Sequence, residues 1–300
     1  MTTAKRKKQI SRNRTLFIIL MLAPALTGFC VFYVYVNFSS VLMSFSVVEK
    51  GRTVVGLSNY GRFFRELRAP GSQMLSGFLN TVATFFSGLL ITYPVSLVIC
   101  YFIFKRIAGY KFFRFVFYMP AIIMGTVSVV LFKYVIQRGG PLDWVFQNAF
   151  HAELPPFLTQ SGWASGTVIF YAVFFSLGSN MLIFSGAMTG INTEVLEAAK
   201  LDGCGIAREL IQIVIPLIWP TVSTMLLLVS VGLFTASGPV LLLTKGAFNS
   251  YTISYWIYER MLEGSNLEFA AATGIICTLA GFPVVLAVRY GLNKLGDKLS

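Results

Sequence analysis

The sequence predicts an all-α membrane protein, a bundle of six transmembrane helices with both chain termini in the cytoplasm. Composition, long apolar stretches and the placement of basic residues predict this class. Of the 300 residues, 56% are hydrophobic and 12% are charged, and the mean hydropathy is +0.72. An ordinary soluble domain carries about 25% charged residues. The composition therefore argues against a soluble enzyme, a disordered chain and a disulfide-rich secreted module.

Six apolar stretches are long enough to cross a bilayer, because a helix needs about 20 apolar residues to span a hydrocarbon core of about 30 Å. They are 16–36, 77–104, 115–132, 164–191, 215–243 and 270–288. The first stretch continues uncharged through 37–46, a Ser- and Phe-rich tail that we expect at the membrane interface. The first stretch is also too long for the apolar part of a signal peptide, so we expect an uncleaved helix.

The distribution of Lys and Arg predicts the orientation. With the N-terminus inside, the inner segments 1–15, 105–114, 192–214 and 289–300 hold 15 of the 24 basic residues, although the outer segments are longer. The positive-inside rule then places both termini in the cytoplasm. We expect a basic cytoplasmic N-terminus at 1–15, a six-helix domain at 16–292 and a cytoplasmic tail at 293–300.

Several kinds of site lack their residues in this sequence. Cys30, Cys100 and Cys277 lie inside apolar stretches, and the chain has one histidine, His151, so neither a disulfide framework nor a metal site is expected. The net charge of +12 lies mostly at the ends of apolar stretches, which argues against nucleic-acid binding. A P-loop for ATP is absent from the sequence.

The inner segment 192–214 departs from the positive-inside trend and predicts helix, glycine turn and helix. Asn192 or Thr193 suits the N-cap, and Gly203 with Gly205 suits a left-handed stop. A second short helix is expected at 206–214, and Pro216 would occupy the first turn of the next span. From the residues alone, two interpretations stay equally open. In one interpretation, the first short helix of this segment docks on another protein. In the other, it lies on the membrane or packs on its own bundle.

The same segment resembles the EAA signature of bacterial ABC-importer permeases. Glu197-Ala198-Ala199 is followed after three residues by Gly203 and, nine residues later, by Ile213-Val214-Ile215-Pro216. Only Ile215, in place of Leu, departs from that pattern. The Leu201-Asp202-Gly203 version is similar to the carbohydrate-uptake branch. Shorter similarities occur at Pro24, Asn59, Asn80, Met119 and 139–143, where Asp143 replaces the more usual Asn.

The resemblance implies the fold of a type I ABC importer and the role of a non-catalytic permease subunit in a bacterial cytoplasmic membrane. It implies a second permease, two ATP-binding subunits that hold ATP and Mg, an extracytoplasmic solute-binding protein and a carbohydrate substrate. No cofactor is implied in this chain. Within the loop, the resemblance gives Glu197 an ionic contact with the ATPase and Gly203 the turn. Further loop residues with implied roles in close approach or in connection to the fifth span are Ala198, Ala199, Asp202, Ile213, Ile215 and Pro216.

The predicted spans contain no charged residue except near their ends, which suits a neutral polar solute better than an ion-coupled carrier. Uncharged polar residues and a helix break at Gly238-Pro239 are therefore candidates for the solute path, although Ser and Thr in spans more often serve helix contacts. The main candidates are Tyr171, Asn180, Ser230, Thr235, Ser237, Gly238 and Pro239. Further candidates are Ser176, Ser179, Ser223, Thr273 and Thr278.

Two other functional classes were weighed. A self-sufficient secondary transporter or channel predicts intramembrane charges or an internal repeat, and we find neither in the sequence. A membrane-embedded transferase predicts clustered acidic or histidine residues at a membrane face. The one acidic cluster here is the 192–214 loop, which has no histidine.

Overall fold

Three of the predicted spans form long, nearly unbroken helices. The structure is a computed structural model that describes residues 2–49, 52–235, 239–264 and 266–299. The second span consists of α4 (Gln73–Ser87), the π-helical segment η2 (Gly88–Thr92) and α5 (Tyr93–Phe104). The fourth is α9 (Trp163–Thr189), and the sixth lies within α16 (Leu267–Leu299). These helices match the predicted stretches 77–104, 164–191 and 270–288 to within a few residues, except that α16 extends further in both directions.

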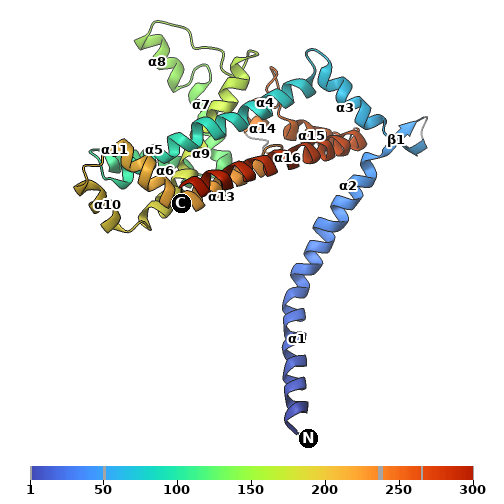
Figure 1. Cartoon of the computed structure of the whole chain (residues 1–300). Helices are drawn as coiled ribbons and strands as arrows, with labels where there is room; N and C mark the ends of the chain where they lie inside the picture. Colours follow the sequence, from blue (N-terminus) through green and yellow to red (C-terminus); the bar gives the residue numbers. More distant parts are fainter. Residues whose placement is uncertain (1, 50–51, 236–238, 265, 300) are drawn as a thin grey trace.

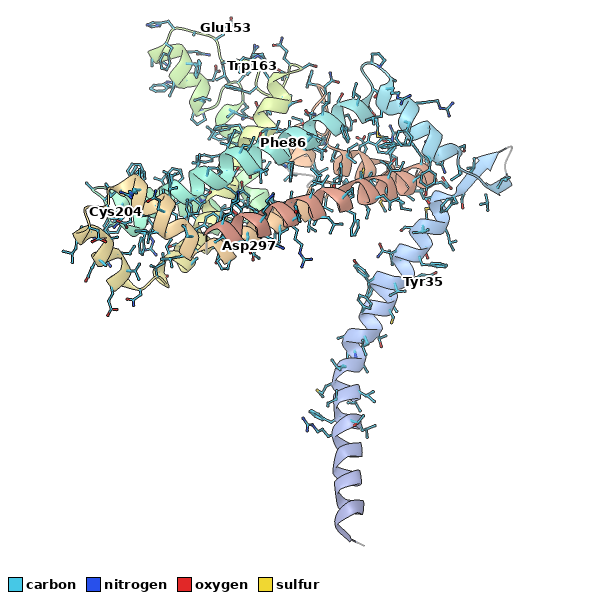
Figure 2. All side chains as sticks on the ribbon, viewed as in Figure 1. Tyr35, Phe86, Glu153, Trp163, Cys204 and Asp297 are labelled. Carbon is cyan, nitrogen blue, oxygen red and sulfur yellow. The ribbon has the colours of Figure 1, made fainter. Side chains whose placement is uncertain are left out.

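The first helix leaves the rest of the molecule (Figure 1). It consists of α1 (Thr2–Gly28), the π-helical η1 (Phe29–Tyr35) and α2 (Val36–Ser44). None of its apolar window is buried inside the chain, and Tyr35, labelled in Figure 2, is largely exposed. The tail at 37–46, expected as an interfacial segment, instead continues the helix to Ser44.

A small hairpin departs from the all-α prediction. Strands β1 (Ser46–Glu49) and β2 (Arg52–Val55) pair antiparallel, with Val47 opposite Val54. Both strands are rich in β-branched residues, which favour extended backbone. No strand is predicted here from the sequence, where the apolar stretch 37–46 ends at the first residue of β1. The hairpin leads into α3 (Ser58–Arg68).

The third predicted span, 115–132, is bent. Helix α6 (Tyr110–Ile122) ends beside Pro120, and α7 (Gly125–Ile136) with α8 (Pro141–Ala149) continues at an angle of 113°. A proline inside a helix removes a backbone hydrogen bond and favours a break within a few residues. Hydropathy measures only apolar content, so it could not distinguish this bend from a straight crossing.

The fifth predicted span, 215–243, is also broken. Helix α13 (Trp219–Val231) lies at 76° to the preceding helical segment, Ile206–Leu217, and α14 (Val240–Leu243) follows a turn. Four helices are long and apolar enough to cross a membrane in the described part of the chain, or up to six if each bent pair forms one span. Helix α15 (Ile253–Leu262) lies between α14 and α16 in the chain.

The main hydrophobic core joins the second, fourth and fifth spans. Its buried members include Leu97, Met181, Phe184 and Val222, and it also contains Leu196 and Val214 of the 192–214 loop. A second cluster around Met74, Ile253 and other buried residues packs α3, α4, α15 and α16 at the opposite end. The loop is therefore packed as part of the bundle rather than attached by a flexible connection.

Candidate functional site: the 192–214 loop and a hydroxyl-lined cavity

Helix α10 (Thr193–Leu201) begins and ends as its sequence predicts. Its N-cap is Asn192, whose Oδ1 accepts a hydrogen bond from the Glu194 N–H at 3.1 Å. At the other end the N–H of Cys204 donates to the Ala199 carbonyl at 3.0 Å, and that of Gly203 donates to Lys200 at 3.2 Å. This pair of bonds forms a Schellman motif. It needs a left-handed residue, and Gly203 has φ +73°. Gly205 instead is extended and begins the next helix.

One face of α10 packs on the bundle and the other is exposed. Leu196 and Ala199 are buried, so the small side chain of Ala199 serves contact with the chain's own core. Glu197, Ala198 and Asp202 are exposed, and Leu201 is 89% exposed although it is apolar. Glu197 forms no ion pair with another described residue. The exposed face of α10 therefore carries an acid without an ion pair, Glu197, beside an exposed apolar side chain, Leu201.

The second part of the loop continues directly toward the fifth span. Helix α11 (Ile206–Glu209), the π-helical η3 (Leu210–Val214) and α12 (Ile215–Leu217) form one helical segment. Pro216 lies near the end of this segment rather than in the first turn of the span, because the 76° bend falls at Ile218. Val214 is fully buried, and Ile213 and Ile215 are half-buried. These residues connect the loop to the bend.

A buried ion pair attaches α11 to the C-terminal end of α5. The Lys105 Nζ donates to Glu209 Oε2 at 2.8 Å and also contacts the other carboxylate oxygen. The Glu209 side chain is 3% exposed. This contact cannot be predicted from the sequence, because Glu209 lies 104 residues from Lys105 and nothing near either residue indicates the other.

A cavity of about 250 Å³ lies between the second, fourth and fifth spans. Four hydroxyl groups line it together with apolar side chains and two glycines, and its lining has no charged residue. The hydroxyls come from Thr81, Thr84, Thr92 and Ser176, and the other lining residues are Phe85, Gly88, Ala172, Val173, Val229, Gly232 and Leu233.

The hydroxyls of this cavity differ in their hydrogen bonds. Thr81, Thr84 and Ser176 each donate to a carbonyl of their own helix at 2.6–2.7 Å. The Thr81 oxygen also accepts a hydrogen bond from the Ile253 N–H at 3.0 Å, whereas the oxygens of Thr84 and Ser176 keep lone pairs available. The Thr92 Oγ1 is buried without a hydrogen-bond partner among the described residues. A buried polar atom without a partner is unusual and costly. The Thr84 and Ser176 oxygens can therefore accept hydrogen bonds from a hydroxyl-rich solute.

None of the main path candidates that the structure describes belongs to the lining of this cavity. Tyr171 stacks on Phe175 at 4.1 Å in a buried cluster, and the buried Ser230 hydroxyl donates to Leu226 of its own helix. Asn180 is buried. Thr235 donates to the Gly232 carbonyl. Pro239 is the N-cap of α14, and Ser237 and Gly238 lie outside the described residues.

Among the further candidates, only Ser176 reaches the cavity. Ser223, Thr273 and Thr278 donate to carbonyls of their own helices. The cavity residues Thr81, Thr84 and Thr92 on the second span were not singled out from the sequence. Hydroxyl residues in spans look alike in sequence, and helix rotation decides which of them face a cavity.

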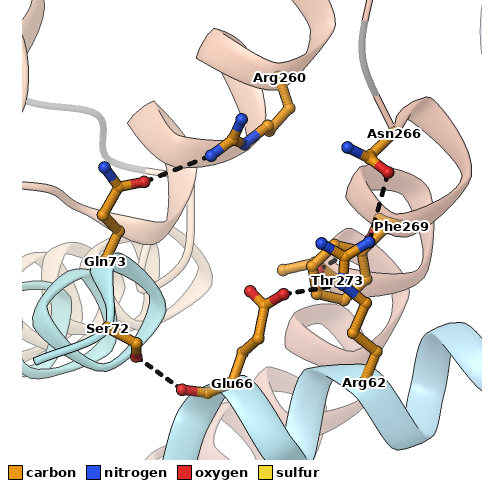
Figure 3. A network of polar contacts seen from close by, with 8 residues as sticks. All are labelled: Arg62, Glu66, Ser72, Gln73, Arg260, Asn266, Phe269 and Thr273. Carbon is orange, nitrogen blue, oxygen red and sulfur yellow. Dashed lines mark hydrogen bonds and ion pairs between the residues drawn. The ribbon is translucent and has the colours of Figure 1, made fainter. Parts of the chain in front are cut away.

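Polar contacts fix the end of the molecule opposite the loop (Figure 3). The Arg62 guanidinium lies over the Phe269 ring at 4.3 Å, donates to Asn266 at 3.3 Å and pairs with Glu66 at 2.7 Å. Arg260 donates to Gln73 at 3.3 Å. These contacts join α3, α4, α15 and α16. No group of His, Cys, Asp or Glu that could hold a metal ion occurs among the residues described.

Other residues that carry the family resemblance have structural roles. The Asn59 amide donates to the carbonyls of Ser44 and Ser46 and fixes α3 to the first helix. The Asn80 amide donates to Asn249 and Tyr251 and holds the segment before α15. Sequence alone could not separate these positions from functional ones.

Comparisons with known proteins agree with this geometry. Residues 74–295 match the family described as "Binding-protein-dependent transport system inner membrane component". The chain is 27% identical to the sn-glycerol-3-phosphate transport system permease protein UgpA of Salmonella typhimurium, over 92% of this chain and 94% of that protein. It is 25% identical to the arabinooligosaccharides transport system permease protein AraP of Bacillus subtilis, over 92% and 87% of the two chains.

Solved structures share the fold. A chain of a bacterial ABC transporter involved in the import of the acidic polysaccharide alginate superposes with a TM-score of 0.80 at 20% identity, covering 97% of this chain and 99% of that one. A second structure, of that kind of transporter with an alginate-bound periplasmic protein, also gives 0.80, with 21% identity and coverage of 96% and 97%. The family match covers most of the chain and includes the loop and the cavity. The chain therefore belongs to the family of inner membrane components of binding-protein-dependent transport systems.

Proposed function

We propose that this chain is the permease subunit of an ATP-driven importer that moves a neutral carbohydrate across a bacterial cytoplasmic membrane by alternating access. In this proposal six spans at 16–292 place the basic segment 1–15, the loop at 192–214 and the tail at 293–300 in the cytoplasm. The partners are a second permease, two ATP-binding subunits that hold ATP and Mg, and an extracytoplasmic solute-binding protein.

The exposed face of α10 is the observation that carries the proposal. Glu197 and Leu201 lie uncovered on a helix whose opposite face is buried in the bundle core. An unpaired acid beside an exposed apolar side chain suits a helix that docks into a groove on another protein. Because the chain has no P-loop, the partner at this face would supply the ATP hydrolysis.

The cavity supports a neutral, hydroxyl-bearing solute. It offers four hydroxyls and no cation to balance a phosphate or carboxylate. The relatives are named for a phosphate ester in one case and for arabinooligosaccharides in another. The uncharged lining favours the second kind of substrate, because a buried anion without a partner is costly.

A self-sufficient secondary transporter or channel is the alternative. Ion-coupled carriers use charged groups at membrane depth, but α4, η2, α5, α9 and α13 carry no charged residue. The uncovered face of α10 also has no role in that alternative.

Co-purification from the native host tests the proposal. The wild-type chain should bring an ATP-binding subunit with it, and Glu197→Lys should reduce that subunit by about tenfold, because the reversed charge opposes docking. Glu153→Lys, the same change on an exposed outer loop, is the matched control and should retain it. In proteoliposomes with the binding protein, an arabino-oligosaccharide should stimulate ATP hydrolysis and sn-glycerol 3-phosphate should not. An ATPase that is absent from wild type, or retained undiminished by Glu197→Lys, would contradict the docking assignment.

A further inference from the structure

The Lys105–Glu209 ion pair stands out because it joins two inner segments that are far apart in sequence. Lys105 is the C-cap of α5, and Glu209 is the last residue of α11. The Glu209 side chain is almost fully buried, and the Lys105 side chain is 24% exposed. Two further ion pairs among the described residues, Arg62–Glu66 and Arg260–Glu263, each join residues that are only three or four positions apart, in α3 and at the end of α15.

The surroundings of the pair are mostly apolar. Lys105 Nζ lies 5.9 Å from the centre of the Tyr101 ring, and the Tyr101 hydroxyl lies near the Glu209 carboxylate. Tyr101 belongs to the main core, together with Leu196 of α10 and Val214 of η3. Burying two charges is costly, and a pair of apolar side chains is often as stable or more stable at such a place. Stability alone therefore gives a poor account of this pair, whereas a directional contact that selects one arrangement of two helices accounts for it.

The pair also lies at the end of a rigid connection to the cavity. Thr92, which lines the cavity, directly precedes α5, and Lys105 directly follows it. The 12 residues of α5 span about 18 Å at 1.5 Å per residue. The chain itself offers a second connection through η3 and α12, but that one passes the 76° bend at Ile218 before it reaches the cavity residues Val229 and Gly232.

We propose that the Lys105–Glu209 pair is a positioning contact that makes the second span move with the 192–214 loop, so that a displacement of the loop reaches the cavity through α5. The inference rests on the proposed function, because it assumes that the loop is displaced by a docked ATPase. The pair does not touch the solute or the ATPase. It holds α11 and α5 in a fixed relation while the bend at Ile218 lets the fifth span change its angle. Coupling through a physical contact of this kind requires an element that both sites bias.

The test measures solute import and ATP hydrolysis in the same proteoliposomes, with the whole complex and its binding protein. Glu209→Gln and Lys105→Met remove one charge each, and the double variant Lys105→Glu with Glu209→Lys restores a pair with reversed charges. Lys111→Met, an exposed lysine of the same inner segment, is the matched control. ATP hydrolysis should persist in both single variants, while solute imported per ATP should fall by about tenfold, within the range typical of coupling between sites.

The double variant should recover most of the lost import per ATP, and Lys111→Met should match wild type. Equal losses of import and hydrolysis in the single variants would indicate a merely structural role and overturn the inference. Unchanged import per ATP, or a double variant no better than the single ones, would overturn it as well. If a single variant fails to assemble, Lys105→Arg keeps the test open, because it preserves the charge and should keep wild-type coupling. A wild-type complex that neither imports solute nor contains an ATPase would refute the proposed function instead.

Discussion

Thr92 differs from the other hydroxyl-bearing residues of the cavity in its hydrogen bonding. The residue contributes to the cavity lining, and its hydroxyl is buried and has no hydrogen-bond partner among the described residues. The other three cavity hydroxyls each satisfy a carbonyl of their own helix. Two roles are open to this hydroxyl, a hydrogen bond to the transported solute or a purely structural place in the fold.

Replacing Thr92 by Val separates these roles, because it removes the hydroxyl at nearly constant volume. Import at saturating binding protein should fall about two- to tenfold, which corresponds to one hydrogen bond of about 0.5–1.5 kcal/mol. Thermal stability in detergent should stay unchanged or rise slightly, since no internal hydrogen bond is lost. Thr273→Val is the control, because the buried Thr273 hydroxyl donates to Phe269 away from the cavity. It should lose stability and keep its import rate. The opposite pattern would mean that Thr92 is structural.

At this scale the sequence predicts local features well and distant ones poorly. The N-cap at Asn192 and the turn at Gly203 follow from neighbouring residues, and the structure confirms both. The inward position of Ala199 and the pairing of Lys105 with Glu209 depend on how helices pack. Neighbouring residues do not specify how helices pack, so these two features could not be predicted from the sequence.

Helices α9 and α6 approach each other closely at Gly178. A Cβ built on Gly178 would clash with the Phe117 carbonyl oxygen and lie 3.1 Å from the Ala121 Cβ. The backbone of α6 cannot turn aside as a flexible side chain could. The fourth span therefore depends on a glycine at this position for its contact with the third.

Gly178→Ala should consequently destabilise the chain by about 1–3 kcal/mol, the usual cost of overpacking. Gly186→Ala on the same helix is a matched control, because a Cβ there would meet nothing within 4 Å. It should be neutral or stabilising by up to about 1 kcal/mol, since alanine favours helix. Thermal unfolding of the two purified variants in detergent measures the difference. Equal melting temperatures would show that α6 and α9 can move apart to accept the added methyl group without a loss of stability.

Hydropathy located the helices better than it located their breaks. The second, fourth and sixth spans agree with it because each helix is long and straight enough to follow its apolar content. The third and fifth depart from it at Ile123 and Ile218, which are themselves apolar. Pro120 and Pro220 lie close to these breaks, but prolines at 24, 94 and 283 leave their helices continuous. A proline alone therefore does not predict a bend.

In the whole molecule, three of the four segments assigned to the cytoplasm lie at one end, whereas the N-terminal segment lies apart from them at the end of the protruding first helix (Figure 1). The α10–α11 loop, the turn after α5 and the C-terminal end of α16 lie together, and the hairpin, α3 and the start of α16 lie at the opposite end (Figure 1). The placement of these three segments is compatible with the orientation that we propose from the basic residues, and the placement of the N-terminal segment gives that orientation no support. The positions of partner subunits could not be predicted from this sequence, because their contact surfaces depend on other chains.

Labelling of cysteines tests that orientation. Cys204 is free and partly exposed in the loop. A membrane-impermeant maleimide should therefore label it in inside-out vesicles and leave it unlabelled in intact spheroplasts. Introducing Glu153→Cys on the outer loop, in a Cys204→Ser background, should give the reverse pattern. Cys204→Ser alone is the control for the remaining cysteines. Labelling of Cys204 from outside would contradict the proposed topology.

The length of the first helix has a consequence for the outer surface of the protein. The apolar part at 16–36 is about 31 Å long at 1.5 Å per residue, which matches a hydrocarbon core of about 30 Å. The helix nevertheless continues without interruption to Ser44. With the N-terminus inside, the last eight residues would raise the valine-rich hairpin about 12 Å above the lipid. At that height its unpaired strand edges face water, so a soluble protein could reach them without touching the bilayer.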